Sequence, residues 1–217
     1  DDNSIYQNDL DCEIWFDITQ TDPDGDNIPY WTETNIYGTD PEVDNTGEDP
    51  DDDGVPIEWE HKWGHEFKYS HSEETYVHNW FYGPFKWEKH EKLDPDQDSI
   101  SNVEEYLTAQ WKSDPFRKDI FVELDQMEAG PNGEIASMLP NGSKELMYKA
   151  FNRQNIILHI DDGSWENTCS DMIPFDDEGE NTTRDELMQI REDWFLHGDE
   201  NNWRRGVFHY GLVVYNA

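Results

Sequence analysis

Three windows of twelve residues carry acidic side chains at the same four positions, and this repeat constrains the chain more than any other feature. In residues 22–33, 49–60 and 94–105, positions 1, 3 and 5 are aspartate and position 12 is glutamate. Position 2 is proline and position 7 is apolar in each window. Agreement at six positions in three copies exceeds what an acidic composition produces by itself, so the repeat predicts a folded unit with one chemical role.

Carboxylates at alternate positions of a short loop suit a hard divalent cation. Ca²⁺ takes six to eight oxygen ligands at about 2.3–2.6 Å, supplied here by positions 1, 3 and 5, the carbonyl of position 7 and a bidentate glutamate at position 12. We therefore expect about three Ca²⁺ ions, one in each loop. The predicted ligands are Asp22, Asp24, Asp26, Ile28 and Glu33 in loop 1, Asp49, Asp51, Asp53, Val55 and Glu60 in loop 2, and Asp94, Asp96, Asp98, Ile100 and Glu105 in loop 3.

A strongly negative charge sets the conditions under which such loops fold. The chain has 51 acidic and 15 basic side chains, and its first 60 residues contain no lysine or arginine. Carboxylates crowded into one loop repel one another by a few kcal/mol at intermediate dielectric, so we expect the folding of this part to be linked to calcium. High salt would also screen the charge, but it does not explain a fixed spacing. The same field repels phosphate, which argues against nucleic acid and anionic membrane surfaces as partners.

Each loop is expected to lead into a short helix that carries the glutamate of position 12. Ser101 and Glu104 form a capping-box pattern at the start of one such helix. Gly38 and Gly64 are expected to end the other two. Proline at position 2 and turn-like residues before the loops argue against a preceding helix, so the unit differs from an EF-hand.

The loops, together with the linkers "YGTDPEVD" (37–44) and "KSDP" (112–115), resemble thrombospondin type 3-like calcium repeats, which occur in secreted bacterial and archaeal proteins. The resemblance covers about residues 17–115 and implies an exported, calcium-binding module. In the linkers, Asp40, Asp44 and Asp114 either add ligands or form turns.

An insert at residues 61–92 separates loops 2 and 3 and is rich in histidine. His61 and His65 are spaced like a zinc pair on one helix face, but Gly64 interrupts that helix and no HExxH motif follows. We therefore interpret these histidines as surface or partner-facing residues and do not expect zinc in this chain. The five histidines of the insert are His61, His65, His71, His78 and His90.

The insert also contains a dense aromatic stretch, "HNWFYGPFKWEK". Small calcium repeats bury little apolar surface by themselves, so we expect these rings to build a miniature core under the insert. If they are exposed instead, they predict a contact site for sugar rings or for another subunit. The rings are Trp80, Phe81, Tyr82, Phe85 and Trp87.

The C-terminal hundred residues have the pattern of an α/β domain. Apolar, β-rich runs at 119–125, 156–161 and 206–215 alternate with helical patterns at 143–155 and 183–198. The order β-α-β-α-β predicts a mostly parallel sheet with helices. We therefore expect two parts: a small, loop-rich calcium-repeat module with short helices at 1–115, and an α/β domain at 116–217.

This second part is similar to the first half of a secreted zinc metalloprotease-like domain of the metzincin type. The similarity lies in "RKDIFVELDQME", "NIILHIDDG" and "RRGVFHYGLVV". In that family a helix with an HExxH motif follows the third strand, and the 217 residues contain no such motif, so the resemblance assigns no catalytic residue. We expect His159 and His209 to be core or sheet-face residues. Asp161 and Asp162 precede Gly163 at a strand end, which is a common turn or ligand position, and we assign them no catalytic role.

Other features favour an exported protein at the cell surface or outside the cell. The chain opens with Asp1, as after removal of a signal peptide, and has no apolar stretch of the roughly 20 residues that a membrane helix needs. Cys12 and Cys169 form one disulfide or remain two free thiols. Asn141-Gly-Ser143 and Asn181-Thr-Thr183 are glycosylation sequons.

We expect a calcium-stabilised extracellular structural protein, a cell-surface or filament subunit that is not catalytic as given. Strand addition at an open sheet edge would join its copies into a homo-oligomer or polymer. One alternative is a fragment of a secreted zinc-dependent endopeptidase, and another is a carbohydrate-binding surface protein that binds glycans through its aromatic insert.

Overall fold

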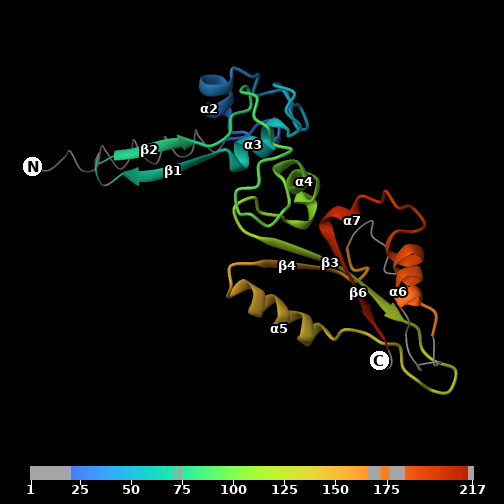
Figure 1. Cartoon of the computed structure of the whole chain (residues 1–217). Coiled ribbons are helices and arrows are strands. Elements are labelled where there is room, and N and C mark those ends of the chain that lie inside the picture. The colour runs from blue at the N-terminus through green and yellow to red at the C-terminus, as the bar shows by residue number, and fades with distance from the viewer. Residues whose placement is uncertain (1–20, 71, 73–74, 166–171, 176–183, 215–217) are drawn as a thin grey trace, which may run out of the picture. The chain divides into compact units, whose positions relative to one another are not determined.

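The computed structural model describes residues 21–70, 72, 75–165, 172–175 and 184–214, and it divides into two compact units, residues 1–93 and 94–217 (Figure 1). Loops 1 and 2 and the insert belong to the first unit, whereas loop 3 belongs to the second, with the α/β sheet. Cys12, Cys169 and the sequon at 181–183 lie outside the described residues.

The first unit is built around the two acidic loops. The apolar residues at position 7 are its anchors, because the side chains of Ile28 and Val55 are fully buried, next to a buried Ile57 and Trp59. Its elements are α2 (Tyr30–Thr32), the π-helical turn η1 (Glu33–Tyr37), α3 (Ile57–Trp63), β1 (His65–Ser70) and β2 (Thr75–Trp80).

The expected helix after each loop is present and carries the glutamate of position 12. Glu33 opens η1, and Glu60 lies within α3. Gly38 ends η1 with a left-handed φ of 75°. Gly64 ends α3 for a different reason: a Cβ at this position would collide with the carbonyl oxygens of Glu60 and Tyr82, so only glycine allows the chain to turn back here.

The insert forms an antiparallel hairpin in which β1 pairs with β2, from His65 opposite Trp80 to Ser70 opposite Thr75. The predicted miniature core is right for Tyr82 alone, which is 7% exposed and stacks on Trp59. It is wrong for the other four rings, which are 42–59% exposed. The exposed rings are Trp80, Phe81, Phe85 and Trp87.

The second unit is a mixed α/β domain with a parallel sheet, as the sequence pattern predicts. β3 is its central strand: β6 runs parallel along one edge, and β4 and then the short β5 run parallel along the other. The elements are α4 (Asn102–Leu107), the 3₁₀ turn η2 (Ala109–Trp111), β3 (Asp119–Met127), α5 (Asn141–Asn152), β4 (Ile157–Asp161), β5 (Met172–Ile173), α6 (Arg184–Ile190), the π-helical turn η3 (Arg191–Phe195), α7 (Arg204–Val207) and β6 (Phe208–Val213).

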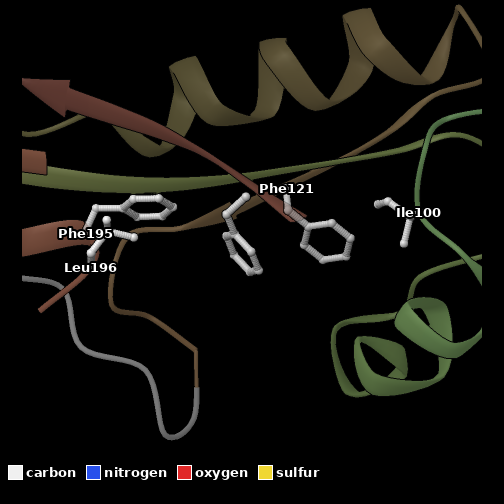
Figure 2. Close-up of a cluster of buried hydrophobic side chains, with 5 residues drawn as sticks. Ile100, Phe121, Phe195 and Leu196 are labelled. Carbon is white, nitrogen blue, oxygen red and sulfur yellow. The ribbon is translucent and has the colours of Figure 1, made fainter. Parts of the chain in front are cut away.

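Loop 3 and the sheet share one hydrophobic core. Phe121 of β3 and Phe208 of β6 pack with Phe195 and Leu196 from the end of η3. Ile100, the apolar residue at position 7 of loop 3, completes the cluster, which lies on the face of the sheet opposite α5 (Figure 2). The predicted capping box of Ser101 and Glu104 is confirmed, so loop 3 passes directly into α4.

The helices of the second unit leave much apolar surface uncovered. Neither α5 nor α6 has a buried residue, and Leu146, Leu187 and Met188 are about half exposed or more. Among the described residues, no helix has the length and apolar content needed to cross a lipid bilayer.

Candidate metal centres

The three acidic loops have the same backbone conformation. Positions 4 and 6 have a positive φ in each loop, although the residues there differ. At position 6, the φ values are 69° for Asn27, 101° for Gly54 and 82° for Ser99. The residues at position 4 are Gly25, Asp52 and Gln97, with φ values of 87°, 62° and 64°.

The aspartate at position 1 holds this conformation in place. In loop 1, the carboxylate of Asp22 accepts the backbone N–H groups of Gly25 at 2.9 Å and of Asn27 at 3.0 Å. The same pair of bonds recurs at 2.8–3.0 Å in loops 2 and 3. The equivalent aspartates are Asp49, with Asp52 and Gly54, and Asp94, with Gln97 and Ser99.

The aspartate at position 5 links each loop to a later part of the chain. One of its carboxylate oxygens accepts the N–H of position 7, at 2.7–3.3 Å in the three loops. The other oxygen accepts a backbone N–H from beyond the loop. These bonds join Asp26 to Asn45 at 3.3 Å, Asp53 to Glu88 at 3.1 Å and Asp98 to Asp119 at 2.7 Å.

The three aspartates of each loop converge as the ligands of one ion do. In every loop, positions 1, 3 and 5 each offer a carboxylate oxygen within 4.8 Å of the others. Two oxygens bound to one Ca²⁺ at up to about 2.6 Å lie no more than about 5.2 Å apart, so this spacing is compatible with a shared ion. The structure thus brings together nine of the predicted carboxylate ligands in three groups.

The aspartates at position 3 have carboxylate oxygens that lack hydrogen-bond donors. Both carboxylate oxygens of Asp24 and of Asp51, and one of Asp96, are hidden from solvent and have no hydrogen-bond partner among the described residues. A buried carboxylate without a donor is costly unless a cation compensates it. The same deficit at the same position of three loops is what a bound cation would satisfy.

The glutamates at position 12 are completely buried, at 0–1% exposure. Glu33 is oriented by the hydroxyl of Thr39, which donates to its Oε1 at 3.0 Å. Glu105 groups with Asp98 and with Asp119 at the start of β3, and neither of its carboxylate oxygens has a hydrogen-bond partner in the described part of the chain. Glu60 groups with Asp53 and two residues that follow the hairpin, Glu88 and His90.

Burial and like charges make these carboxylates hard to ionise without a cation. Burial, reinforced by Asp119 and Asp98, raises the pKa of Glu105 to about 9. Burial and the neighbouring aspartates raise the pKa of Asp96 to about 7 and that of Asp51 to about 6. A divalent ion beside Glu105, Asp96 or Asp51 would therefore favour the ionised form of that carboxylate.

Four residues that sequence reasoning did not select as ligands lie against the acidic groups: Asn45, Glu88, His90 and Asp119. They follow the position 5 aspartates at intervals of 19, 35, 37 and 21 residues, so no fixed spacing identifies them.

The three linker aspartates each form a hydrogen bond that stabilises a turn. Asp40 accepts the N–H of Glu42 at 3.2 Å, and Asp114 accepts that of Phe116 at 3.0 Å. Asp44 accepts the N–H of Thr46 at 2.9 Å in the same way. None of the three belongs to a metal-capable group among the described residues, so the turn-forming role is the one that the structure supports.

The histidines of the sheet do not form a hydrolytic zinc centre within the described part of the chain. His159 is buried on β4, where its Nε2 contacts Asp119 and its ring stacks on Phe121 at 4.2 Å between centroids. His209 is exposed on β6. Zinc hydrolysis needs about three protein ligands and a general base, and neither histidine belongs to a described group of that kind.

A buried ion-pair network lies near the ends of the strands. Arg204 of α7 donates to Glu123 of β3, and also to Oδ2 of Asp161 at the end of β4 at 2.8 Å. Burial raises the pKa of Glu123 to about 7 even though Arg204 opposes the shift. Asp161 also accepts the N–H of Gly163 at 3.1 Å, which is the turn expected there. The network ties three elements together.

A cavity of about 920 Å³ lies beside α5 and β4. Lys112, Arg117 and Lys149 line it together with Trp111 and Trp165, which makes it locally basic in a chain of net charge −36. None of the metal-capable groups of the described residues lies in this cavity. The acidic centres are therefore separate from it.

Comparison of the chain with models of known protein families, with curated proteins and with solved structures finds no match. The assignment of a function therefore rests on the geometry of the sites themselves.

Proposed function

We propose that the chain is a calcium-stabilised extracellular structural protein, in which loops 1, 2 and 3 each bind one Ca²⁺ in the manner of thrombospondin type 3-like repeats. The observation that carries the proposal is the recurrence, at position 3 of all three loops, of carboxylate oxygens that are hidden from solvent and lack a hydrogen-bond donor among the described residues. An oxygen-only set of ligands of this kind is suited to Ca²⁺.

Counting the ions in single-site variants tests this proposal. The full chain, saturated with Ca²⁺ and freed of loose ions by gel filtration, is expected to retain one ion per loop. Asp24→Asn, Asp51→Asn and Asp96→Asn are each expected to lose one ion. Asp52→Asn is the matched control, because Asp52 is exposed at position 4 and asparagine tolerates its φ of 62°. Equal calcium content in the variants and the control would contradict the proposal.

An assembly role follows from the surfaces that the second unit leaves open. Within the described residues, β4 and β6 each pair with β3 alone, so each has an edge available for strand addition. The exposed apolar residues of α5 and α6 supply further contact surface. Calcium would rigidify each copy and so lower the entropic cost of joining copies into a filament.

Light scattering during a calcium titration tests the assembly role. The calcium-loaded chain is expected to form high-mass species, and Leu146→Glu on the exposed face of α5 is expected to reduce them. Glu145→Gln, next to it and also exposed, is the control. A monomer at all calcium and protein concentrations would rule out self-assembly.

Carbohydrate binding is the second candidate, and the exposure of Trp80, Phe81, Phe85 and Trp87 favours it over a purely structural insert. Flat aromatic rings stack on the apolar faces of sugars. Titration with glycans should then change tryptophan fluorescence in the native chain and leave it unchanged in Trp87→Ala, since Trp87 is 59% exposed. No response from the native chain across a glycan panel would remove this candidate.

A further inference from the structure

Loop 2 differs from the other two loops because a histidine lies among its carboxylates. Asp53 of the loop, Glu60 of α3, and Glu88 and His90 after the hairpin each offer one ligand atom, and these four atoms all lie within 4.8 Å of one another. The corresponding group of loop 3 consists of Asp98, Glu105 and Asp119 and is therefore made of oxygens alone.

The group in loop 2 is shielded from water. The side chains of Asp53, Glu60 and His90 are fully buried, and that of Glu88 is 12% exposed. The His90 ring meets Tyr82 and Trp59 edge-on, with centroids 4.8 and 5.8 Å away. Both rings are themselves buried, so they hold the imidazole in one orientation at the edge of the acidic group.

The two distances from His90 to its neighbouring carboxylates are those expected between ligands of a small, four-coordinate metal. His90 Nε2 lies 3.3 Å from Asp53 Oδ2 and 3.6 Å from Glu60 Oε1. Two ligands at about 2.1 Å from a tetrahedral Zn²⁺ are about 3.4 Å apart. Charge-assisted hydrogen bonds are shorter, at about 2.7–2.9 Å, so the distances suit ligands around an ion better than a direct ion pair.

The balance of charge in this group also favours a bound divalent cation. An imidazolium would contribute one positive charge against the three carboxylates of the group. Lys86 pairs with Oε1 of Glu88, but Oε2 of Glu88 and both oxygens of Glu60 are hidden from solvent and accept no hydrogen bond from the described residues. A divalent cation at the centre would reach all of these atoms at once.

We propose that Asp53, Glu60, Glu88 and His90 form a second kind of metal site that binds a first-row transition-metal dication, for which Zn²⁺ is the probe. Imidazole nitrogen is a ligand for zinc and its neighbours in the periodic table, whereas Ca²⁺ takes oxygen ligands. Asp53 and Glu60 are also predicted calcium ligands of loop 2, so the two sites would share these carboxylates. Sequence reasoning missed the site because His90 is 30 residues from Glu60 and follows no zinc motif.

Metal analysis of the full chain tests the site. The purified chain is equilibrated with excess CaCl₂ and a small excess of ZnCl₂, passed through gel filtration, and its zinc and calcium are counted by mass spectrometry. We expect one Zn²⁺ per native chain, and its loss in His90→Gln and in Glu88→Gln. His209→Gln, an exposed histidine in the other unit, is the control and should retain the ion. Circular dichroism of each variant checks that it is folded.

The outcomes separate this proposal from its competitors. Absence of zinc from the native chain, or its retention by a folded His90→Gln, overturns the site. Loss of zinc in His61→Gln alone also overturns it, because that result assigns the ion to the adjacent pair of His61 and His65, whose ring centroids are 4.9 Å apart. If His90→Gln fails to fold, Glu88→Gln decides. Calcium is counted in the same samples. Bound zinc without calcium would contradict the proposed function and support this site, whereas bound calcium without zinc would support the proposed function and contradict this site.

Discussion

Ser99 has the least suitable side chain at position 6 of the three loops. Its φ of 82° lies in the left-handed region, which serine adopts only with strain. Asn27 and Gly54 occupy the same position in the other loops, and asparagine and glycine adopt this region at lower cost. The N–H of Ser99 still donates to Asp94 at 3.0 Å, so the loop keeps its conformation in spite of the residue.

Ser99→Gly is therefore expected to stabilise the calcium-loaded second unit by up to about 1 kcal/mol, because glycine adopts this φ without a Cβ clash. The midpoint of urea unfolding measures the change. Ser101→Ala, two residues away, should act in the opposite direction by about 1 kcal/mol, since it removes the cap of α4. A lower midpoint for Ser99→Gly would show that the strain is not there.

Glu105 gives calcium binding a dependence on pH. Its pKa of about 9 means that metal-free Glu105 is protonated at pH 7. The folded group binds its proton more tightly than the unfolded one, so its contribution to metal-free stability is complete below its ordinary pKa of 4.5 and disappears as the pH rises through about 9. Ca²⁺ requires the carboxylate, so binding should release this proton at pH 7 but not at pH 10.

Calorimetry at pH 7 in buffers of different ionisation enthalpy counts the protons released. The native chain should release about one more proton than Glu105→Gln, which cannot ionise. Glu145→Gln, on the exposed surface of α5, should match the native chain. An equal release from all three proteins would show that Glu105 is not a ligand.

At the scale of elements, Arg204 joins α7 to two strands of the sheet. Its guanidinium is the partner of Glu123 on β3 and Asp161 on β4, both of which are 1% exposed. Removing a cation from buried carboxylates costs more than the ion pair itself contributes, because uncompensated charge is left in a dry site.

Arg204→Met is expected to destabilise the second unit by about 3–5 kcal/mol. Urea unfolding of the calcium-loaded chain measures this loss. Arg205→Met is the control, since Arg205 is exposed, and it should change stability by no more than about 0.5 kcal/mol. Arg204 lowers the pKa of Glu123, which is about 7 in the native chain, so the variant protonates Glu123 at a higher pH. The loss should therefore shrink as the pH falls from the alkaline range towards about 7, because protonation removes one of the two uncompensated charges.

At the scale of the whole molecule, loop 3 is coupled to the sheet, so an ion bound in this loop is expected to stabilise the sheet as well. Ile100 of the loop packs in the core of the second unit, and Asp98 accepts the N–H of Asp119, the first residue of β3, at 2.7 Å. Loop 1 lies in the other unit. The loops therefore differ in what each stabilises, although they share one conformation.

Asp96→Asn, in loop 3, is expected to expose β3 to hydrogen exchange. An ion present at 100 times its dissociation constant stabilises the folded unit by about 2.7 kcal/mol, so its loss should lower the protection of β3 amides by about 100-fold. Asp24→Asn, at the same position of loop 1, should leave those amides unchanged. Equal effects of the two substitutions would show that loop 3 is not coupled to the sheet.

The sequence predicted those parts whose information is local. The spacing of the acidic residues predicted that nine carboxylates converge in three groups, because a tight loop of twelve residues leaves their side chains few directions. The alternation of strands and helices after Lys118 predicted the parallel sheet, since the patterns of β3, α5, β4 and β6 each lie within one short segment. The aromatic insert was predicted less well, because burial of Trp80 or Trp87 depends on a covering layer that no local pattern specifies.

By itself, the sequence determined three acidic loops with a common spacing and the class of the domain that follows them. Only the tertiary structure decided which residues complete each loop. Asp119 reaches loop 3 because β3 begins beside it, and His90 reaches loop 2 because the chain returns to α3 after the hairpin. Such contacts depend on the packing of whole elements, whereas the convergence of the aspartates in each loop depends on the geometry of twelve consecutive residues.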